Sequence, residues 1–443
     1  MYMISVPNLQ PLLSGNKYIA LILAVLIVGC SPATKLQKDK QTDVITKSDP
    51  IKQEGQKPPS VKDTTAVIPE VKTDVPTVKD GDQDIKPVKK FNHFDLAVVL
   101  PFDPNENNER FLQYYGGMKL AADELQLEGY DLTVKVYNAE DANLLTTLQT
   151  EPTQLIFAPS EEQTLKQILD WGKANNIPVV SPFFSLSSVE NAPHYVQLKP
   201  SLRSHFASMV KHAIQRFPLD DIVLVGRNTK NDKAWFKFFQ STASELLENQ
   251  AVQPIQEYFV LDDSLTTGSH VFTDLINSGK KVFIFPNYSY KDELYLYNAM
   301  RRLLAEKGTN MVTVYGMPIL KDSEKMGFDF FSGLNLHVPA SRYVDETREE
   351  VKSFDRKFFD RYGALPEGDA YEGFDHFLFI GRHLSQYGLD FPQYLSTDNG
   401  QYLQARFDVR AVHTEGSSTE IDFFENKYLE ILYFDGTRFV QAY

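Results

Sequence analysis

The sequence predicts an α/β head made of two doubly wound parallel-sheet lobes with a cleft between them, preceded by a signal peptide and a disordered linker. Three observations predict this organisation. Short apolar strands alternate with helices through residues 94–316, which is typical of parallel sheets covered on both faces. The head, residues 94–443, is longer than one hydrophobic core usually holds. The segment before it, residues 31–90, contains no aromatic side chain.

The first 29 residues have the order of a secretory signal peptide. Lys17 is the only charged residue among the first 30, and the apolar run Tyr18 to Val28 and the small residue Gly29 follow it. The run is short for a membrane-spanning helix. Cys30, the only cysteine of the chain, comes next. The alternatives are an ordinary signal peptide with an incidental thiol and an uncleaved membrane anchor.

The sequence "IVGC" before and at Cys30 resembles the lipobox of bacterial lipoproteins. The resemblance implies that residues 1–29 are removed and that Cys30 becomes the lipidated first residue. Lipidation would explain the single thiol, because an unpaired cysteine in an oxidising compartment invites stray disulfides. Ser31, and not an aspartate, follows Cys30. In well-studied bacteria this resembles the pattern of lipoproteins that are sorted to the outer membrane. We therefore expect a periplasm-facing protein that is attached to a membrane only through the lipid on Cys30, with the outer membrane favoured.

Residues 30–93 are predicted to be a lipid-anchored, disordered linker. Its residues 31–90 repeat a loose unit of Val, Lys, Asp, Thr and Pro, as in "VKDTTAVIPEVKTDVPTVKD". Such a composition cannot bury enough apolar surface to offset the entropy of ordering. The segment has twelve Lys and ten Asp or Glu, so it is not a polybasic arm. It either holds the head at a distance from the membrane or is a passive spacer.

Predicted strands and helices alternate from the first residues of the head to about residue 316. Near-continuous apolar runs predict strands, and apolar residues at helical spacing predict helices. Predicted strands are 94–102, 131–141, 153–159, 177–182, 221–227, 254–261, 280–286 and 310–316. Predicted helices are 110–127, 143–148, 160–175, 201–217, 233–249, 270–278 and 291–307.

The C-terminal part differs in character. Residues 347–362 and 369–387 are predicted helices. The runs "ARFDVRAV" and "KYLEILYFDGTRFVQAY" are predicted antiparallel strands, the second with a tight turn at Asp435-Gly436.

The order of strand ends resembles that of type I periplasmic binding proteins, the family of branched-chain amino acid receptors. The segments concerned are "FDLAVVLPF", "YYGGMKLAADEL", "LTVKVYNAED", "LIFAPS", "IPVVSPFFS", "IVLVGRN", "VFIFPNY", "VTVYGMP" and "AYEGFDHFLFIG". The resemblance covers residues 94–443. It implies a first lobe of about 94–200 and 341–395 and a second of about 201–340 and 396–443, with chain crossings near residues 200, 340 and 395.

The resemblance also implies a ligand site at the carboxyl ends of the strands, as in open α/β sheets generally. Ser185 stands where the family places a hydroxyl-bearing ligand residue, and we expect it to face Tyr288 across the cleft. The acidic residue that would pair with a ligand ammonium after "VTVYG" is missing, and Met317 stands there. Because an unpaired buried ammonium is costly, a classical α-amino acid ligand is disfavoured. The predicted ligand-binding residues are Ser160, Phe183, Phe184, Ser185, Asn287, Tyr288 and Met317.

Structural roles are open for the same residues. Ser160 with Gln163 fits a capping box at a helix start, and Ser185 could initiate a turn. Tyr288 could pack on the following helix, and the two phenylalanines could belong to the core of the lobe or the rim of the cleft. His376 and His383 are seven residues apart on one predicted helix, a spacing that favours core or surface positions over a metal site.

Several function classes are excluded or disfavoured. The head holds 32 basic and 49 acidic residues, which argues against nucleic acid and anionic lipid as partners. We find no P-loop, dinucleotide fingerprint, nucleophile elbow or acid/base pair, so the sequence predicts neither an enzyme nor a cofactor or metal site. The expected function is that of a lipid-anchored binding protein-like module of the cell envelope that binds a small polar or peptide-like ligand. The alternative is a regulator of cell-wall synthesis that binds an envelope protein through a ligand-free binding-protein fold.

Overall fold

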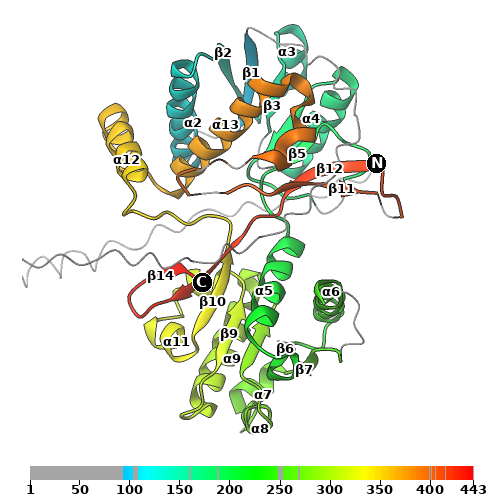
Figure 1. Cartoon of the computed structure of the whole chain (residues 1–443), viewed down its shortest axis with the longest axis vertical. Helices are drawn as coiled ribbons and strands as arrows, with labels where there is room; N and C mark the ends of the chain where they lie inside the picture. Colours follow the sequence, from blue (N-terminus) through cyan, green and yellow to red (C-terminus); the bar gives the residue numbers. More distant parts are fainter. Residues whose placement is uncertain are drawn as a thin grey trace, which may run out of the picture. The chain divides into compact units, whose positions relative to one another are not determined.

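The computed structural model describes residues 93–442, apart from 103–107, 159–160, 187–188, 248–252, 268–269, 399, 401, 405 and 415. These residues form two lobes, each built on a seven-stranded sheet with helices on its faces (Figure 1). The prediction of two doubly wound α/β lobes is therefore confirmed. The predicted signal peptide, Cys30 and the linker up to residue 92 lie outside the described residues.

The first lobe contains a sheet with the strand order β11-β12-β5-β4-β3-β1-β2. All neighbouring strands are parallel except β11, which runs antiparallel to β12. The strands are β1 (Phe94–Leu100), β2 (Leu132–Asn138), β3 (Leu155–Phe157), β4 (Val179–Ser181), β5 (Tyr195–Gln197), β11 (Val409–His413) and β12 (Ile421–Asn426). The helical segments are α2 (Glu109–Leu127), α3 (Leu144–Thr150), α4 (Glu162–Asn175), α12 (Glu349–Tyr362), α13 (Gly368–Tyr387) and the 3-10 segment η3 (Gly388–Thr397).

Alternate side chains of β1 build two separate apolar layers in this lobe. Leu96 and Val98 pack with α2 and α13 on one face of the sheet. Ala97 and Val99 pack with α3 and α4 on the other. Because successive side chains of a strand point to opposite faces, the apolar run Leu96–Leu100 of β1 contributes to both layers.

The second lobe contains a sheet with the strand order β14-β13-β10-β9-β8-β6-β7. Its strands are β6 (Ile222–Gly226), β7 (Gln256–Phe259), β8 (Val282–Phe285), β9 (Thr313–Gly316), β10 (Leu336–Ala340), β13 (Glu430–Phe434) and β14 (Phe439–Gln441). The helical segments are α5 (Leu202–Arg216), η1 (Leu219–Asp221), α6 (Lys230–Leu246), α7 (Asp262–Thr267), α8 (Thr273–Asn277), η2 (Tyr290–Asp292), α9 (Glu293–Glu306), α10 (Ile319–Asp322) and α11 (Phe328–Gly333).

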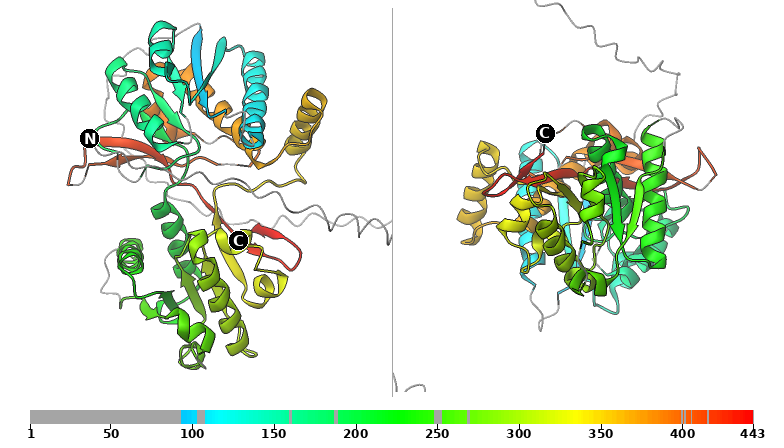
Figure 2. Two further views of the ribbon diagram at one scale, coloured as in Figure 1. Left: turned by 180° about the vertical axis from the view of Figure 1, so that it is seen from behind. Right: turned by 90° about the horizontal axis from the view of Figure 1, so that it is seen from below.

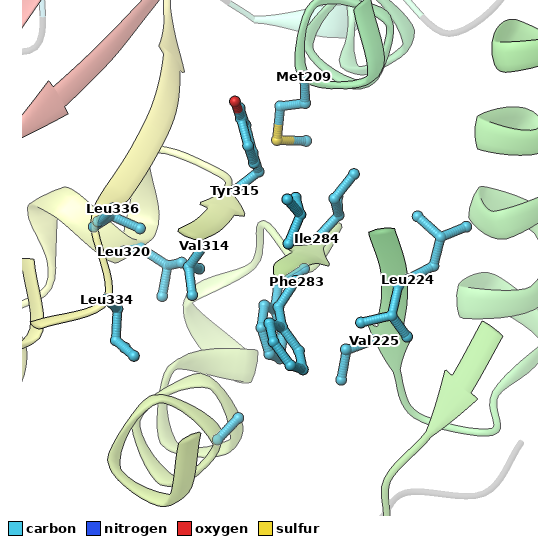
Figure 3. Close-up of a cluster of buried hydrophobic side chains, with 14 of the residues drawn as sticks. Met209, Leu224, Val225, Phe283, Ile284, Val314, Tyr315, Leu320, Leu334 and Leu336 are labelled. Atoms are coloured by element: carbon cyan, nitrogen blue, oxygen red, sulfur yellow. The ribbon is translucent and has the colours of Figure 1, made fainter. Parts of the chain in front are cut away.

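The core of the second lobe is one continuous apolar cluster. Met209 of α5 lies over the central strands, where Ile284 and Tyr315 are fully buried (Figure 3). Leu334 and Leu336 extend the cluster toward β10 (Figure 3). The antiparallel strands β13 and β14 join the same sheet through β10 and form the hairpin predicted at Asp435-Gly436.

The chain passes between the lobes in three segments, which are 198–201, 341–348 and 427–429. The prediction that residues 396–443 return as a whole to the second lobe is wrong. β11 and β12 belong to the first sheet, where β12 pairs in parallel with β5 (Figure 2, left). Only β13 and β14 return to the second sheet, so the third crossing lies about thirty residues later than the predicted residue 395.

Two buried polar residues of β12 explain its placement. The Glu425 carboxylate accepts hydrogen bonds from the backbone N–H and side-chain hydroxyl groups at the start of α5, from Ser201 N at 2.9 Å and Ser204 Oγ at 2.9 Å. The Asn426 side chain donates to the carbonyl of Leu198 at 3.3 Å. The first and third crossing segments are therefore tied to each other by the end of β12.

Helices α2 and α13 lie side by side on one face of the first sheet, and their backbones touch (Figure 1). A Cβ atom on Gly117 of α2 would lie 1.9 Å from the carbonyl oxygen of Ala370 in α13. A Cβ atom on Gly373 of α13 would lie 2.0 Å from the carbonyl oxygen of Tyr114 in α2. Only glycine fits at either position, because the obstructing atoms are backbone atoms that cannot rotate away.

We predict that Gly117→Ala lowers the free energy of unfolding by about 3 kcal/mol, because the two helices must move apart to admit the methyl group. Gly327→Ala is the matched control, since Gly327 has a φ of −123° and a Cβ there would meet nothing within 4 Å. Urea unfolding followed by circular dichroism measures both variants. Equal effects in the two variants would contradict the backbone contact.

Candidate functional site

Five charged residues lie together at the carboxyl edge of the first sheet. Lys199 stands two residues beyond β5, and Arg110 lies in the first turn of α2, the helix that follows β1. Arg342 stands two residues beyond β10, in the second crossing segment. Asp369 and Glu372 belong to the first two turns of α13. We call these five residues the charged cluster.

Two largely buried carboxylates hold the arginines of the charged cluster. Arg110 Nε lies 3.0 Å from Asp369 Oδ1, and one terminal nitrogen of Arg342 lies 3.3 Å from the same oxygen. That nitrogen of Arg342 also lies 3.4 Å from Glu372 Oε2. The carboxylate side chains are 15% and 14% exposed, whereas the two arginine side chains are 45% and 44% exposed. The anions therefore form the base of the cluster and the cations its surface.

The packing around the arginines is close. The Arg110 guanidinium carbon lies 5.1 Å from the ring centre of Phe183, which is buried after β4. A Cβ atom on Gly368 would lie 3.3 Å from the terminal nitrogen of Arg342, so the absence of a side chain at the start of α13 leaves room for this guanidinium. Both cations are thus positioned by neighbours as well as by their carboxylate partners.

The charges of the cluster influence one another. Burial raises the pKa of the Glu372 carboxyl, while Arg342 and Lys199 oppose that rise. Lys199 is exposed, yet desolvation by the surrounding protein lowers the pKa of its ammonium; Glu372 opposes this change and Arg110 adds to it. Lys199 therefore belongs electrostatically to the cluster, although within the described part of the chain its ammonium makes no hydrogen bond or ion pair.

A neutral, buried layer lies beneath the charged cluster. The Phe183 ring packs against Tyr114, with ring centres 4.5 Å apart. A hydrogen bond of 3.2 Å joins the Tyr114 hydroxyl to His376 Nδ1. Burial, with smaller contributions from Arg342 and Lys199, lowers the pKa of His376 to about 3, so this histidine is uncharged at neutral pH.

The second histidine of α13, His383, donates from Nδ1 to the carbonyl of Phe379 at 2.9 Å. Both histidines are therefore core residues of the first lobe. No group of three or more histidine, cysteine, aspartate or glutamate side chains is arranged to hold a metal ion in the described parts of the chain. No helix in those parts is both long and apolar enough to span a membrane.

The predicted site residues of the first lobe have mainly structural contacts. Ser185 accepts a hydrogen bond from Gln197 Nε2 at 3.0 Å, and Gln197 also accepts one from the backbone N–H of Leu186 at 3.0 Å. Gln197 is fully buried and donates in addition to the carbonyl of Lys199 at 3.1 Å. Phe184 packs in the apolar layer under α3 and α4. The sequence interpretation missed Gln197, which positions both the Ser185 loop and Lys199.

Ser160 lies outside the described residues, but the capping box proposed for it is wrong. The N-cap of α4 is Glu161, whose carboxylate accepts from the backbone N–H groups of Gln163 and Thr164. A carboxylate at this position satisfies the free N–H groups of the first turn and also interacts favourably with the helix dipole.

The predicted residues of the second lobe lie at the carboxyl ends of β8 and β9. Asn287 is 2% exposed and donates to Asp232 Oδ1 at 3.3 Å. Tyr288 is 46% exposed, and its ring centre lies 5.5 Å from that of Trp235. Met317 is buried in the apolar core. Of these three residues only Tyr288 offers its side chain to solvent.

Arg227, at the end of β6, is a further cation in the second lobe. One terminal nitrogen lies 2.8 Å from Asp292 Oδ1, and the guanidinium carbon lies 4.4 Å from the ring centre of Tyr295. Arg227 lines a hollow of about 270 Å³ together with Asp262, Asp263, Thr266, Lys291, Leu294, Tyr295 and Asn298. Carboxylates surround this cation, so it differs from the cation-rich edge of the first lobe.

The charged cluster was not found from the sequence because its members come from four distant segments. Arg110 and Asp369 are 259 residues apart. The local signals were present, since Lys199 follows a buried strand, Arg342 follows "HVPAS", and Asp369 and Glu372 open a predicted helix. Each is an ordinary charged residue until the fold brings them together.

Comparison with known proteins identifies the fold. No protein-family model and no curated protein matches the chain. Solved structures do match. An ABC transporter substrate-binding protein from Desulfitobacterium hafniense has a TM-score of 0.54 at 10% identity, over 79% of this chain and 100% of that one. A branched-chain amino acid ABC transporter periplasmic ligand-binding protein from Burkholderia xenovorans has a TM-score of 0.53 at 11% identity, over 79% and 94% of the two chains.

A third solved structure, the LpoA C-domain from Haemophilus influenzae, a regulator of PBP1A, has a TM-score of 0.54 at 11% identity, over 79% of this chain and all of that one. The fold is therefore that of type I periplasmic binding proteins, as the strand ends indicated. At these identities the likeness establishes the fold, which is shared by solute-binding and regulatory proteins.

We predict that Gln197→Leu lowers the free energy of unfolding by about 2–4 kcal/mol, because it leaves the N–H of Leu186 and the carbonyl of Lys199 without their partner. Ser185→Ala removes only one acceptor and should cost about 1 kcal/mol or less. Chemical denaturation of the two variants tests the order. A larger effect for Ser185→Ala would show that the serine, and not the glutamine, organises the loop.

Proposed function

We propose that the chain is a lipid-anchored, periplasmic binding protein-like lipoprotein of the cell envelope that binds a small polar or peptide-like ligand and catalyses no reaction. The observation that carries this proposal is the charged cluster. Exposed cations are held in place by buried carboxylates at the carboxyl edge of a parallel sheet, where α/β folds generally bind ligands. The structural neighbours include solute-binding proteins, which supports a binding role.

The proposed location rests on the N-terminal sequence. The lipobox at Cys30 supports attachment to a membrane through lipid, and Ser31 favours the outer membrane. The linker of residues 30–93 would then hold the head in the periplasm. The acidic head, with 49 acidic and 32 basic residues, supports attachment by the lipid alone, because a negatively charged surface is repelled by anionic lipid headgroups.

The ligand is not expected to be a simple α-amino acid held as in the amino acid receptors. Met317 stands after β9, where the resemblance predicts a carboxylate for the ligand ammonium, and this methionine is buried in the core. Ser160, Phe183, Phe184, Ser185, Asn287 and Tyr288 remain proposed contacts. Phe183 and Asn287 are themselves almost fully buried, so a contact with their side chains would require local movement.

The second candidate function is regulation of cell-wall synthesis through a partner protein. The likeness to the LpoA C-domain favours it, since that protein is a regulator with the same fold. Exposed aromatic and aliphatic side chains near β8, those of Tyr288, Tyr290 and Leu294, also favour a protein contact. This function would need no small ligand.

Mass spectrometry of molecules released from the purified full-length protein distinguishes the two functions. A stoichiometric small molecule that is released on denaturation supports ligand binding. Release of none, together with specific retention of a peptidoglycan synthase on the immobilised protein, would favour the regulatory function. Turnover of a co-purified molecule by the pure protein would contradict the proposal that the chain is not an enzyme.

We predict that Cys30→Ser moves the protein from the membrane fraction to the soluble periplasmic fraction and abolishes incorporation of radiolabelled palmitate, because the thiol is the attachment point of the lipid. Ser31→Ala is the control and should remain lipidated. Palmitate incorporated into Cys30→Ser would show that the anchor is elsewhere.

A further inference from the structure

The three cations of the charged cluster have hydrogen-bond donors that the cluster itself does not use. Arg110 pairs with Asp369 through Nε, and Arg342 pairs through one terminal nitrogen. Within the described residues, no hydrogen bond or ion pair engages the two terminal nitrogens of Arg110 or the ammonium of Lys199. Both side chains are exposed, so a solute can reach these donors.

The cluster has one more cation than it has carboxylates. An unpaired charge close to other charges of the same sign is unfavourable, so an anion that approaches the cluster would be stabilised. Desolvation lowers the pKa of the Lys199 ammonium most, and the nearby Arg110 and Arg342 lower it further. The surplus is also unusual for this chain, whose head has 17 more acidic than basic residues.

The carboxylates hold the two arginines in place. Asp369 and Glu372 are mostly buried and lie on the helix that is packed against α2 through glycine contacts. The guanidinium of Arg110 is also fixed over Phe183. Because these groups are held before a ligand arrives, a ligand would lose less binding free energy in ordering them.

We propose that Lys199, Arg110 and Arg342 bind an oxyanion group of the ligand. This inference rests on the proposed binding function and names the ligand class of that same site. Guanidinium groups present planar donors that match carboxylate and phosphate oxygens, and ammonium adds a point charge. The ligand is therefore an acid whose carboxylate or phosphate group is neutralised by the surplus cation of the first lobe.

Two probes test the proposal on the purified full-length protein in detergent. Glutarate supplies carboxylates and glycerol 3-phosphate supplies a phosphate; both are titrated by calorimetry to 20 mM at constant ionic strength. We expect at least one probe to bind with a stoichiometry of one. Lys199→Gln should weaken that binding about tenfold, and Lys199→Gln with Arg110→Gln should weaken it further.

Lys166→Gln is the matched control, because Lys166 is another exposed lysine of the first lobe and lies on α4. It should leave binding unchanged. Binding of glutarate alone identifies a carboxylate ligand, and binding of glycerol 3-phosphate alone identifies a phosphate ligand. Saturable binding of neither probe, or equal weakening by Lys166→Gln and Lys199→Gln, overturns the oxyanion site. Circular dichroism of Lys199→Gln verifies that this exposed substitution leaves the fold intact.

The failure of this inference can be separated from failure of the proposed function. A small molecule that co-purifies with wild type and with Lys199→Gln in equal amounts would leave the binding function standing and refute the oxyanion site. A co-purified acid that is lost from Lys199→Gln but retained by Lys166→Gln would support both.

Discussion

The first lobe depends on the contact of the α2 and α13 backbones at two glycines. Gly117 and Gly373 allow helices from opposite ends of the head to touch, with the carbonyl oxygens of Ala370 and Tyr114 where side chains would otherwise be. The N-terminal turns of the same two helices contain Arg110 and Asp369. The distance between the helices therefore sets the distance between the charges, and the 3.0 Å ion pair requires close packing. The bond between Tyr114 and His376 spans the same pair of helices.

The sequence predicted the parts of the fold that local patterns determine. Apolar strands such as Phe94–Leu100 are recognisable because both faces of a covered parallel sheet are apolar. The turn at Asp435-Gly436 was recognisable because an Asp-Gly pair favours a tight turn. In the structure Gly436 has a φ of +106°, which glycine adopts without strain. The sheet that β12 joins was not predictable, because any sheet edge satisfies the backbone of a strand. Glu425 and Asn426 fix β12 in the first sheet through hydrogen bonds to residues more than 220 positions earlier in the chain.

The candidate site also has a part that the sequence could indicate and a part that depends on the fold. Strand ends are local features, so the sequence could point to Ser185, Asn287 and Tyr288. Their roles depend on partners that only the fold supplies: Ser185 and Asn287 are occupied by Gln197 and Asp232, and Tyr288 packs beside Trp235. The charged cluster has no local signature, because its five residues come from segments that are far apart along the chain. Burial of Asp369 and Glu372, which distinguishes this cluster from an ordinary surface ion pair, is likewise a property of the packed helices.

The carboxyl ends of the strands carry different charged side chains in the two lobes. The two edges therefore differ in the sign of the ligand charge that they could bind. In the second lobe, Arg227 lies beside Asp292 and within reach of Asp262, and Asp232 is buried with Thr229 and Asn287. Met317, which stands where the resemblance predicts a carboxylate for a ligand ammonium, is buried. At the edge of the first sheet, the charged cluster holds three cations and two carboxylates, and Lys199 is exposed. An anionic group therefore gains most at the first lobe, while the edge around Tyr288 offers mainly aromatic surface. Under the proposed binding function, a ligand that meets both edges would carry an acid group and an apolar or ring-shaped part, as a modified or peptide-like acid does.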